Sequence, residues 1–215
     1  MKNIAPFGIH SITHLIIYCI ISMSLTACSE NDDLENNHAN SNNAPAALLE
    51  FTEQSNEQVK MLAGNLKHAL MSAMQSGGPQ AAVNTCNMQA SEITSQLNTD
   101  SKLQIKRTSL KYRNPNNQPD AWERSILMQF EQQAAEGIAI QQLVHSDKVT
   151  INGQDHFRYM RAIPVQAPCL ACHGTEQQIP ASVHEVLAQH YPDDQATGYG
   201  VGDIRGAFSV WQSID

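Results

Sequence analysis

The chain has 215 residues, of which 41% are hydrophobic and 16% are charged, and it carries a formal net charge of -8. This length suits one domain of ordinary size that buries a core of its own. Only 13 residues are Lys or Arg and they form no basic run, which argues against a surface that binds nucleic-acid phosphates.

The first 27 residues are predicted to be a secretory signal peptide of the lipoprotein type. A weakly basic start leads into an apolar run over residues 15–21, followed by Leu25-Thr26-Ala27-Cys28. The run is too short to anchor a chain across a bilayer, and small residues precede the expected cut. Leu25-Thr26-Ala27-Cys28 resembles the bacterial lipobox, in which the cysteine receives a lipid. We therefore expect Cys28 to be lipidated; an ordinary signal or an N-terminal membrane helix is the alternative.

The predicted location is the periplasm, with the chain anchored to a membrane by several acyl chains. The residue after the cysteine is Ser29 and not an acidic residue, and this favours the outer membrane. Residues 28–45 are almost entirely polar and cannot offset the entropy of ordering, so they are expected to form a flexible tether. Residues 46–215 are then the folded domain.

The folded domain is predicted to begin with two helices. Apolar residues recur at helical spacing from Leu48 to Met74, and this helix should end at Gly77-Gly78. Pro79 suits the first turn of a second helix. The apolar face of that second helix includes Cys86, which is therefore expected to point inward.

The rest of the domain is predicted to be a small antiparallel sheet with shorter helices. Strands are expected at 103–107, 142–146, 156–165 and 207–214, helices at 120–136 and 180–190, a turn at 152–153 and a glycine-rich loop at 197–206. Helices followed by an antiparallel sheet make the fold class α+β.

The strongest chemical signal is the CxxCH segment Cys169-Leu170-Ala171-Cys172-His173. Two thiols at this spacing can each form a thioether with one haem, and the adjacent imidazole is then the proximal iron ligand. A redox dithiol of the thioredoxin type needs a βαβ context that this chain lacks. A zinc site needs a further ligand pair at suitable spacing, and a plain disulfide leaves His173 without a role. The prediction is one covalently attached haem c.

Cys86 is the one thiol that these assignments leave unused, because Cys19 is removed with the signal. It is either a small core hydrophobe or the iron ligand opposite His173, where the metal holds it as thiolate. The other possible distal ligands are Met88, Met160, His68, His184 and His190.

Arginines are the expected partners of the two haem propionates. Arg107 and Arg161 are our candidates, and Arg113 and Arg158 are further possibilities. The glycines of residues 198–206 are not followed by a phosphate-binding GxxxxGK pattern and are expected to allow tight turns or a close backbone approach to the haem edge.

Several motifs occur in a fixed order along the domain. They are AVNTC at 82–86, RTSLKYRNPNN at 107–117, YMRAIP at 159–164, CLACHG at 169–174, YPDD at 191–194 and GDIRGA at 202–207. In these motifs the chain resembles the haem-binding PAS-like domain family, long catalogued as a domain of unknown function. Its members occur in exported bacterial and cyanobacterial proteins and as the extracytoplasmic sensor part of some membrane kinases.

The resemblance implies a PAS-like antiparallel sheet with a helical N-terminal half and one c-type haem. It also implies Cys86 as distal ligand and His173 as proximal ligand. Two protein ligands leave the iron no open position for a substrate, so the expected role is one-electron transfer with an unknown redox partner and not enzymatic catalysis. A thiolate ligand favours the ferric state and a low potential.

The alternative role is an extracytoplasmic redox or gas (CO or NO) sensor whose state is read by a partner protein. A lipobox stands here in place of the membrane helix and kinase of the sensor proteins, so direct signalling across a membrane is in doubt.

Overall fold

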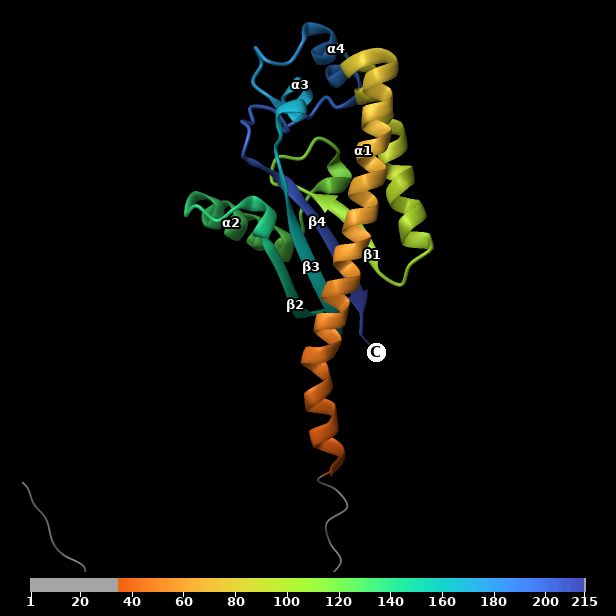
Figure 1. Cartoon of the computed structure of the whole chain (residues 1–215), viewed down its shortest axis with the longest axis vertical. Helices are drawn as coiled ribbons and strands as arrows, with labels where there is room; N and C mark the ends of the chain where they lie inside the picture. The colour runs from red at the N-terminus through yellow and green to blue at the C-terminus, as the bar shows by residue number, and fades with distance from the viewer. Residues whose placement is uncertain (1–34, 215) are drawn as a thin grey trace, which may run out of the picture.

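The computed structural model describes residues 35–214. The predicted signal peptide and the lipidation site Cys28 lie outside the described residues. The fold is α+β, with one four-stranded antiparallel sheet in the order β1-β4-β3-β2. Helix α1 covers one face of this sheet and α2 covers the other (Figure 1). The predicted fold class is confirmed.

Helix α1 (Glu35–Thr99) consists of two helical arms joined by a sharp break at Gly77 and Gly78. The chain reverses direction there, so the second arm, residues 79–99, runs back beside the first arm (Figure 1). Gly78 has φ 68° and ψ -163°, a conformation that is essentially restricted to glycine. The predicted break and the helix that starts at Pro79 are therefore both present.

The start of α1 differs from the sequence-based expectation. The helix begins at Glu35, inside the segment 28–45 that was expected to be a flexible tether. Helix formation is cooperative, and adding a residue to an existing helix costs little once a packed part has formed. The packed part begins near Leu48 and Phe51, so the helix extends outward from there.

The sheet is built from β1 (Gln104–Thr108), β2 (Val144–Ile151), β3 (Gln154–Pro164) and β4 (Ile204–Ser213). Strands β2 and β3 form a hairpin around Asn152 and Gly153, which have φ 53° and 82°, as a tight type I′ turn requires. Strand β4 inserts between β1 and β3. It begins at Ile204, so the end of the predicted glycine-rich loop is strand.

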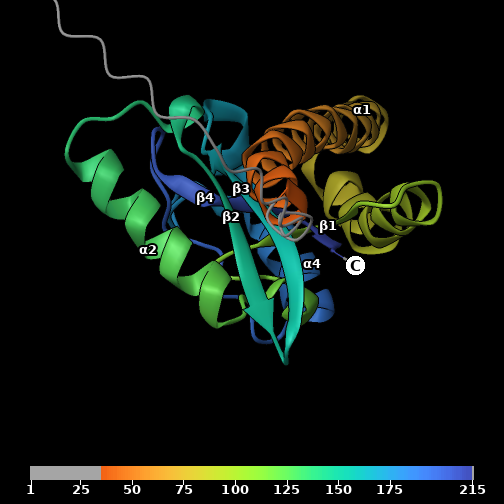
Figure 2. The same ribbon diagram turned by 90° about the horizontal axis from the view of Figure 1, so that it is seen from below.

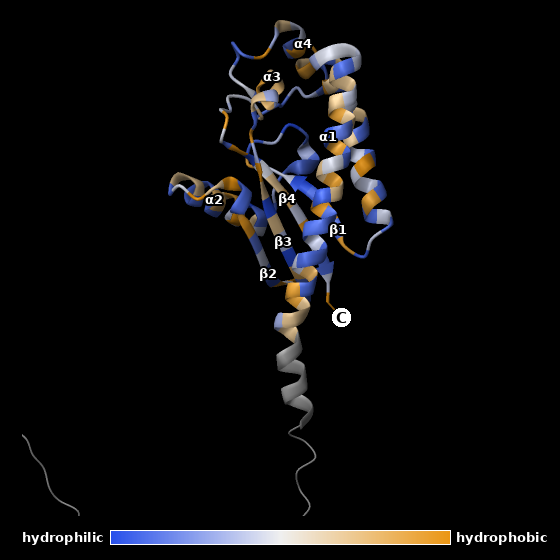
Figure 3. Ribbon diagram, viewed as in Figure 1, coloured by the Kyte–Doolittle hydropathy of each residue, from blue (hydrophilic) through white to orange (hydrophobic). Residues whose placement is uncertain are grey.

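Two cores lie on opposite faces of the sheet, because side chains alternate along each strand. The first arm of α1 packs against one face, which includes Tyr159 and Val210. Helix α2 (Ala121–Ala135) packs against the other, which includes Met160 and Ala207. Both helices accordingly carry hydrophobic as well as hydrophilic residues (Figure 3).

A buried ion-pair network holds the start of α2. Asp120 and Glu123 form a capping box, and Glu123 is fully buried between Lys106 and Arg158 at 2.9 and 3.2 Å. Arg158 also pairs with Asp120 at 2.8 Å. Arg158 is thus engaged in this network, because the buried Glu123 needs a positive partner, and the structure gives no support for its pairing with a propionate.

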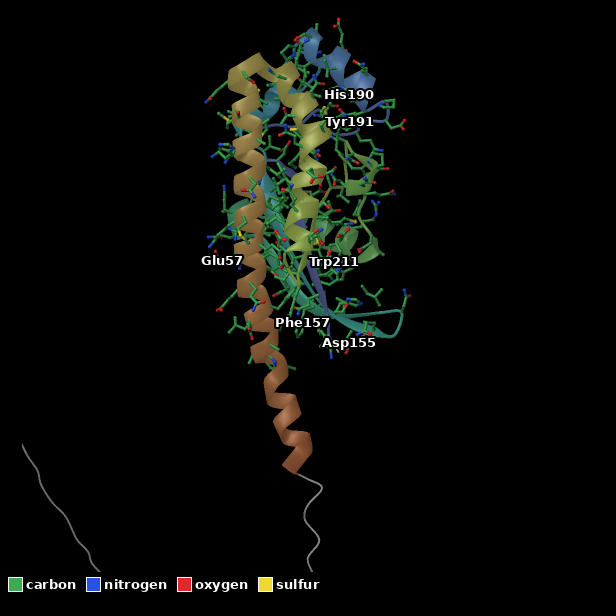
Figure 4. The ribbon with its side chains drawn as sticks, turned by 90° about the vertical axis from the view of Figure 1, so that its right-hand side faces the viewer. Glu57, Asp155, Phe157, His190, Tyr191 and Trp211 are labelled. Carbon is green, nitrogen blue, oxygen red and sulfur yellow. The ribbon has the colours of Figure 1, made fainter. Side chains whose placement is uncertain are left out.

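Three short elements gather at one end of the sheet. They are the 3-10 turn η3 (Ala167–Cys169), α3 (Leu170–His173) and α4 (Ala181–His190). Helix α4 packs on the second arm of α1 through Val83, Val183 and Leu187. Seen from below, the sheet separates α2 from the two arms of α1 (Figure 2). Figure 4 shows His190 and Tyr191 at this end and Asp155 and Phe157 at the other.

Among residues 35–214, no helix is long and apolar enough to cross a membrane.

Replacing Gly78 tests the break in α1. We expect Gly78→Ala to lower the free energy of unfolding by about 1–3 kcal/mol, because alanine is strained at this backbone conformation. Gly64→Ala is the matched control: Gly64 is exposed, within the first arm, with open space where a Cβ would lie. It should raise stability by up to about 1 kcal/mol. Urea denaturation measures both, and equal stability changes would contradict the role of Gly78.

Candidate functional site

The CxxCH segment lies in a single helical turn at the end of the sheet. Cys169 ends η3, and Cys172 and His173 belong to α3. Cys169 and Cys172 are partly exposed free thiols and form no disulfide. Gly174 ends the turn. A Cβ added at Gly174 would collide with the carbonyl of Leu170 and the side chain of Gln178. The tight packing after His173 therefore requires glycine.

The orientation of His173 is set by a hydrogen bond from its Nδ1 to the backbone carbonyl of Ala196, at 2.7 Å. A carbonyl only accepts, so Nδ1 carries the proton and Nε2 presents a lone pair. Burial, and then the positive charges of Arg205 and Arg113, hold the pKa of His173 well below its usual value. The edge of the ring also meets Tyr199, with centroids 6.3 Å apart. His173 is thus a neutral, oriented imidazole with a free metal-binding nitrogen.

Cys86 does not point into the core as expected, since its side chain is exposed to solvent. The second arm of α1 buries Ala82, Val83 and Ala90 instead. Partial burial still raises the pKa of the thiol, while Arg107 and Arg113 act in the opposite direction. Cys86 is therefore an accessible thiol and not part of a core.

The second arm of α1, which carries Cys86, lies against the CxxCH segment. Cys172 packs against the hydrophobic cluster that includes Val83 of this arm. Burial raises the pKa of the Cys172 thiol, and Cys86 and Cys169 act in the same direction. Arg113 donates to the carbonyl of Cys172. The fold therefore brings the second arm of α1 to α3, although the two are far apart in the chain.

The other predicted distal ligands occupy different surroundings. Met160 is fully buried in the core under α2, whereas Met88 is 74% exposed. His68 is exposed on the first arm of α1. His184 bonds to the carbonyl of Glu176, and both ring nitrogens of His190 are engaged by Asn84 and Asn87.

Two arginines of the site, Arg107 and Arg205, are half-buried. Burial lowers the pKa of Arg107 and of Arg205, and within residues 44–214 neither forms an ion pair. Arg205 donates to the hydroxyl of Ser109 and the carbonyl of Lys111 and lies over the ring of Tyr199. A positive charge that is partly removed from water is stabilised by a nearby anion. The site therefore suits an anionic ligand group.

The four arginines named from the sequence separate into different roles. The charges of Arg107 and Arg113 lower the pKa of Cys86, whereas Arg158 belongs to the α2 network. Arg161 bonds to the side chain of Asn56 and the carbonyl of Gln141, and the described residues give it no contact with the CxxCH segment. Arg205 was not predicted from the sequence as a residue of the site. Its signal was the GDIRGA segment, where an arginine directly follows the glycine-rich loop.

These residues fit a haem better than a metal held by protein alone. Among the described side chains, residues 44–214, no three of His, Cys, Asp or Glu are placed to hold a metal ion together. A haem iron needs only two protein ligands, because the porphyrin supplies the other four. The Nε2 of His173, the thiols of Cys169 and Cys172 and the accessible Cys86 suit the iron and vinyl groups of a haem. Arg107 and Arg205, which form no ion pair within residues 44–214, suit its propionates.

Comparisons with known proteins place this geometry in context. The Tll0287-like family model matches residues 31–213. A solved structure, that of the cyanobacterial haem protein Tll0287, is 25% identical in sequence and aligns with a TM-score of 0.53. The alignment covers 75% of this chain and 94% of that protein. No curated protein matches the chain significantly.

Proposed function

The chain belongs to the Tll0287-like family, and from this premise we propose that it is a monohaem c-type cytochrome that serves one-electron transfer. The resemblance noted from the sequence motifs is thereby confirmed at the level of the family. The observation that carries the proposal is His173 in a CxxCH turn, with Nδ1 bonded to Ala196 and Nε2 free. The similar solved structure is that of a haem protein, which supports haem as the ligand.

Each residue of the site has a role in this proposal. Cys169 and Cys172 would hold the haem through thioethers, and His173 would bind the iron through Nε2. Cys86, on the second arm of α1, would be the second protein ligand of the iron. Arg107 and Arg205 would pair with the propionates, so that opposite charges meet. When bound, the haem supplies a one-electron couple.

Filling both axial positions with protein side chains favours electron transfer over catalysis. Thiolate sulfur is an anionic donor, so Cys86 stabilises the ferric form and lowers the potential. We further propose that the protein works in the periplasm, with Cys28 lipidated and anchored to a membrane, where it meets a redox partner protein. The lipobox and the CxxCH segment support this location together, because haem is attached to c-type apocytochromes outside the bacterial cytoplasm.

Covalent attachment is tested by mass spectrometry of the mature protein, made with a c-type haem maturation system. We expect one haem per chain, retained after acid denaturation, because thioethers survive unfolding. The double variant Cys169→Ala, Cys172→Ala should lose it. Cys86→Ala is the matched cysteine control and should keep the covalent haem. A wild-type mass equal to polypeptide plus lipid would remove the basis of this function.

Axial ligation by Cys86 is tested by absorption and electron paramagnetic resonance spectra of the ferric protein. The wild type should be low-spin with thiolate character, and Cys86→Ala should become high-spin or acquire another ligand, since the sulfur donor is gone. Met88→Ala, a change at an exposed neighbour on the same helix, should leave the spectrum unaltered. A Cys86→Ala spectrum identical to the wild type excludes Cys86.

A redox or gas sensor is the second candidate function, and one observation favours it. Cys86 and His173 belong to different elements, and the chain between the two arms of α1 breaks at Gly77 and Gly78. Release of Cys86 on reduction would therefore change the contact between the second arm of α1 and α3. If the reduced wild type binds CO at micromolar concentration, the sensor is favoured; if CO binds only to Cys86→Ala, the carrier is favoured.

A further inference from the structure

Arg113 connects three segments that meet behind His173. Its Nε donates to Asp194 Oδ2 at 2.9 Å, and its Nη2 donates to the carbonyls of Cys172 and Ala196. Asp194 uses its other oxygen, Oδ1, to accept from the backbone N–H of Ala196 at 2.8 Å. Ala196 is the residue whose carbonyl accepts from His173 Nδ1. Arg113 and Asp194 therefore close a ring of hydrogen bonds around the acceptor of His173.

We propose that Arg113 and Asp194 are positioning residues that fix the Ala196 carbonyl, and through it the direction in which His173 presents Nε2. This inference rests on the proposed haem function, in which Nε2 binds the iron. Neither residue needs to touch the haem. Arg113 comes from the loop after β1, and Asp194 and Ala196 from the loop after α4.

The network is arranged to hold a single geometry. The Arg113 and Asp194 side chains are only 12% and 11% exposed, so their ion pair is little weakened by solvent compared with a surface pair. The guanidinium also lies over the ring of Tyr191, 6.0 Å from its centroid. Acceptors on three residues suit the fixed fork of arginine, whereas a lysine ammonium lacks that fork.

The anchoring acts on both sides of the imidazole. The Cys172 carbonyl belongs to the residue directly before His173, so Arg113 holds the backbone at the base of the side chain. The Ala196 carbonyl holds the far side of the ring through Nδ1. Loss of the network leaves the ring attached but free to vary in angle, and the Nδ1–H then opens to solvent more often.

The experiment measures solvent exchange of the His173 Nδ1 proton by NMR in the reduced holoprotein, for the wild type, Arg113→Lys and Asp194→Asn. In Arg113→Lys the exchange should be at least about tenfold faster, since the shared acceptor is no longer held. Asp194→Asn should change in the same direction by a smaller factor. Arg124→Lys, on the exposed face of α2, is the matched control and should stay at the wild-type rate.

The lysine variant separates positioning from charge. A role limited to positive charge near His173 predicts that Arg113→Lys exchanges like the wild type, and this result overturns the inference. If Arg113→Lys fails to fold, Asp194→Asn decides: an unchanged exchange rate overturns the inference and a faster rate supports it. The wild-type mass is measured on the same sample, so a chain without haem refutes the proposed function, whereas wild-type exchange rates in a haem-loaded variant refute the inference alone.

Discussion

The hydrogen bond from His173 Nδ1 to the Ala196 carbonyl is the interaction on which the site depends. It determines which ring nitrogen carries the proton, and so which nitrogen is free to bind a metal. A CxxCH segment in an unfolded chain has no such preference. The loop after α4 and the turn of α3 must lie together before the imidazole is both neutral and directed, and Arg113 holds these two segments to each other.

The surroundings of His173 are positively charged, in contrast to the rest of the chain. The chain as a whole is acidic, with a net charge of -8, yet the surroundings of His173 and Cys86 contain Arg107, Arg113 and Arg205. Only Arg113 has a carboxylate partner among the described residues, namely Asp194. Half-buried positive charges gathered in an acidic protein favour an anionic ligand group, and this is the basis on which we propose that they meet haem propionates.

The break at Gly77 and Gly78 links the fold to the site. Without it, α1 would continue as one rod and carry Cys86 away from the sheet. With it, the second arm returns beside the first and reaches α3 and α4. The break was predictable because two adjacent glycines followed by a proline end one helix and begin another. The exposure of Cys86 was not predictable, because helical spacing shows which residues share a face of the helix but not what packs against that face.

The α+β class, the order of most elements and the CxxCH segment could be predicted from the amino-acid sequence, because they follow from local periodicity, turn residues and spacing. The roles of Arg158 and Arg205 could not. Both are arginines in strands, but Arg158 pairs with Glu123 and Asp120, whereas Arg205 lies over Tyr199, whose ring contacts His173. Their different surroundings arise from the folded arrangement, because the partner of a charged side chain depends on which distant segments the sheet brings together.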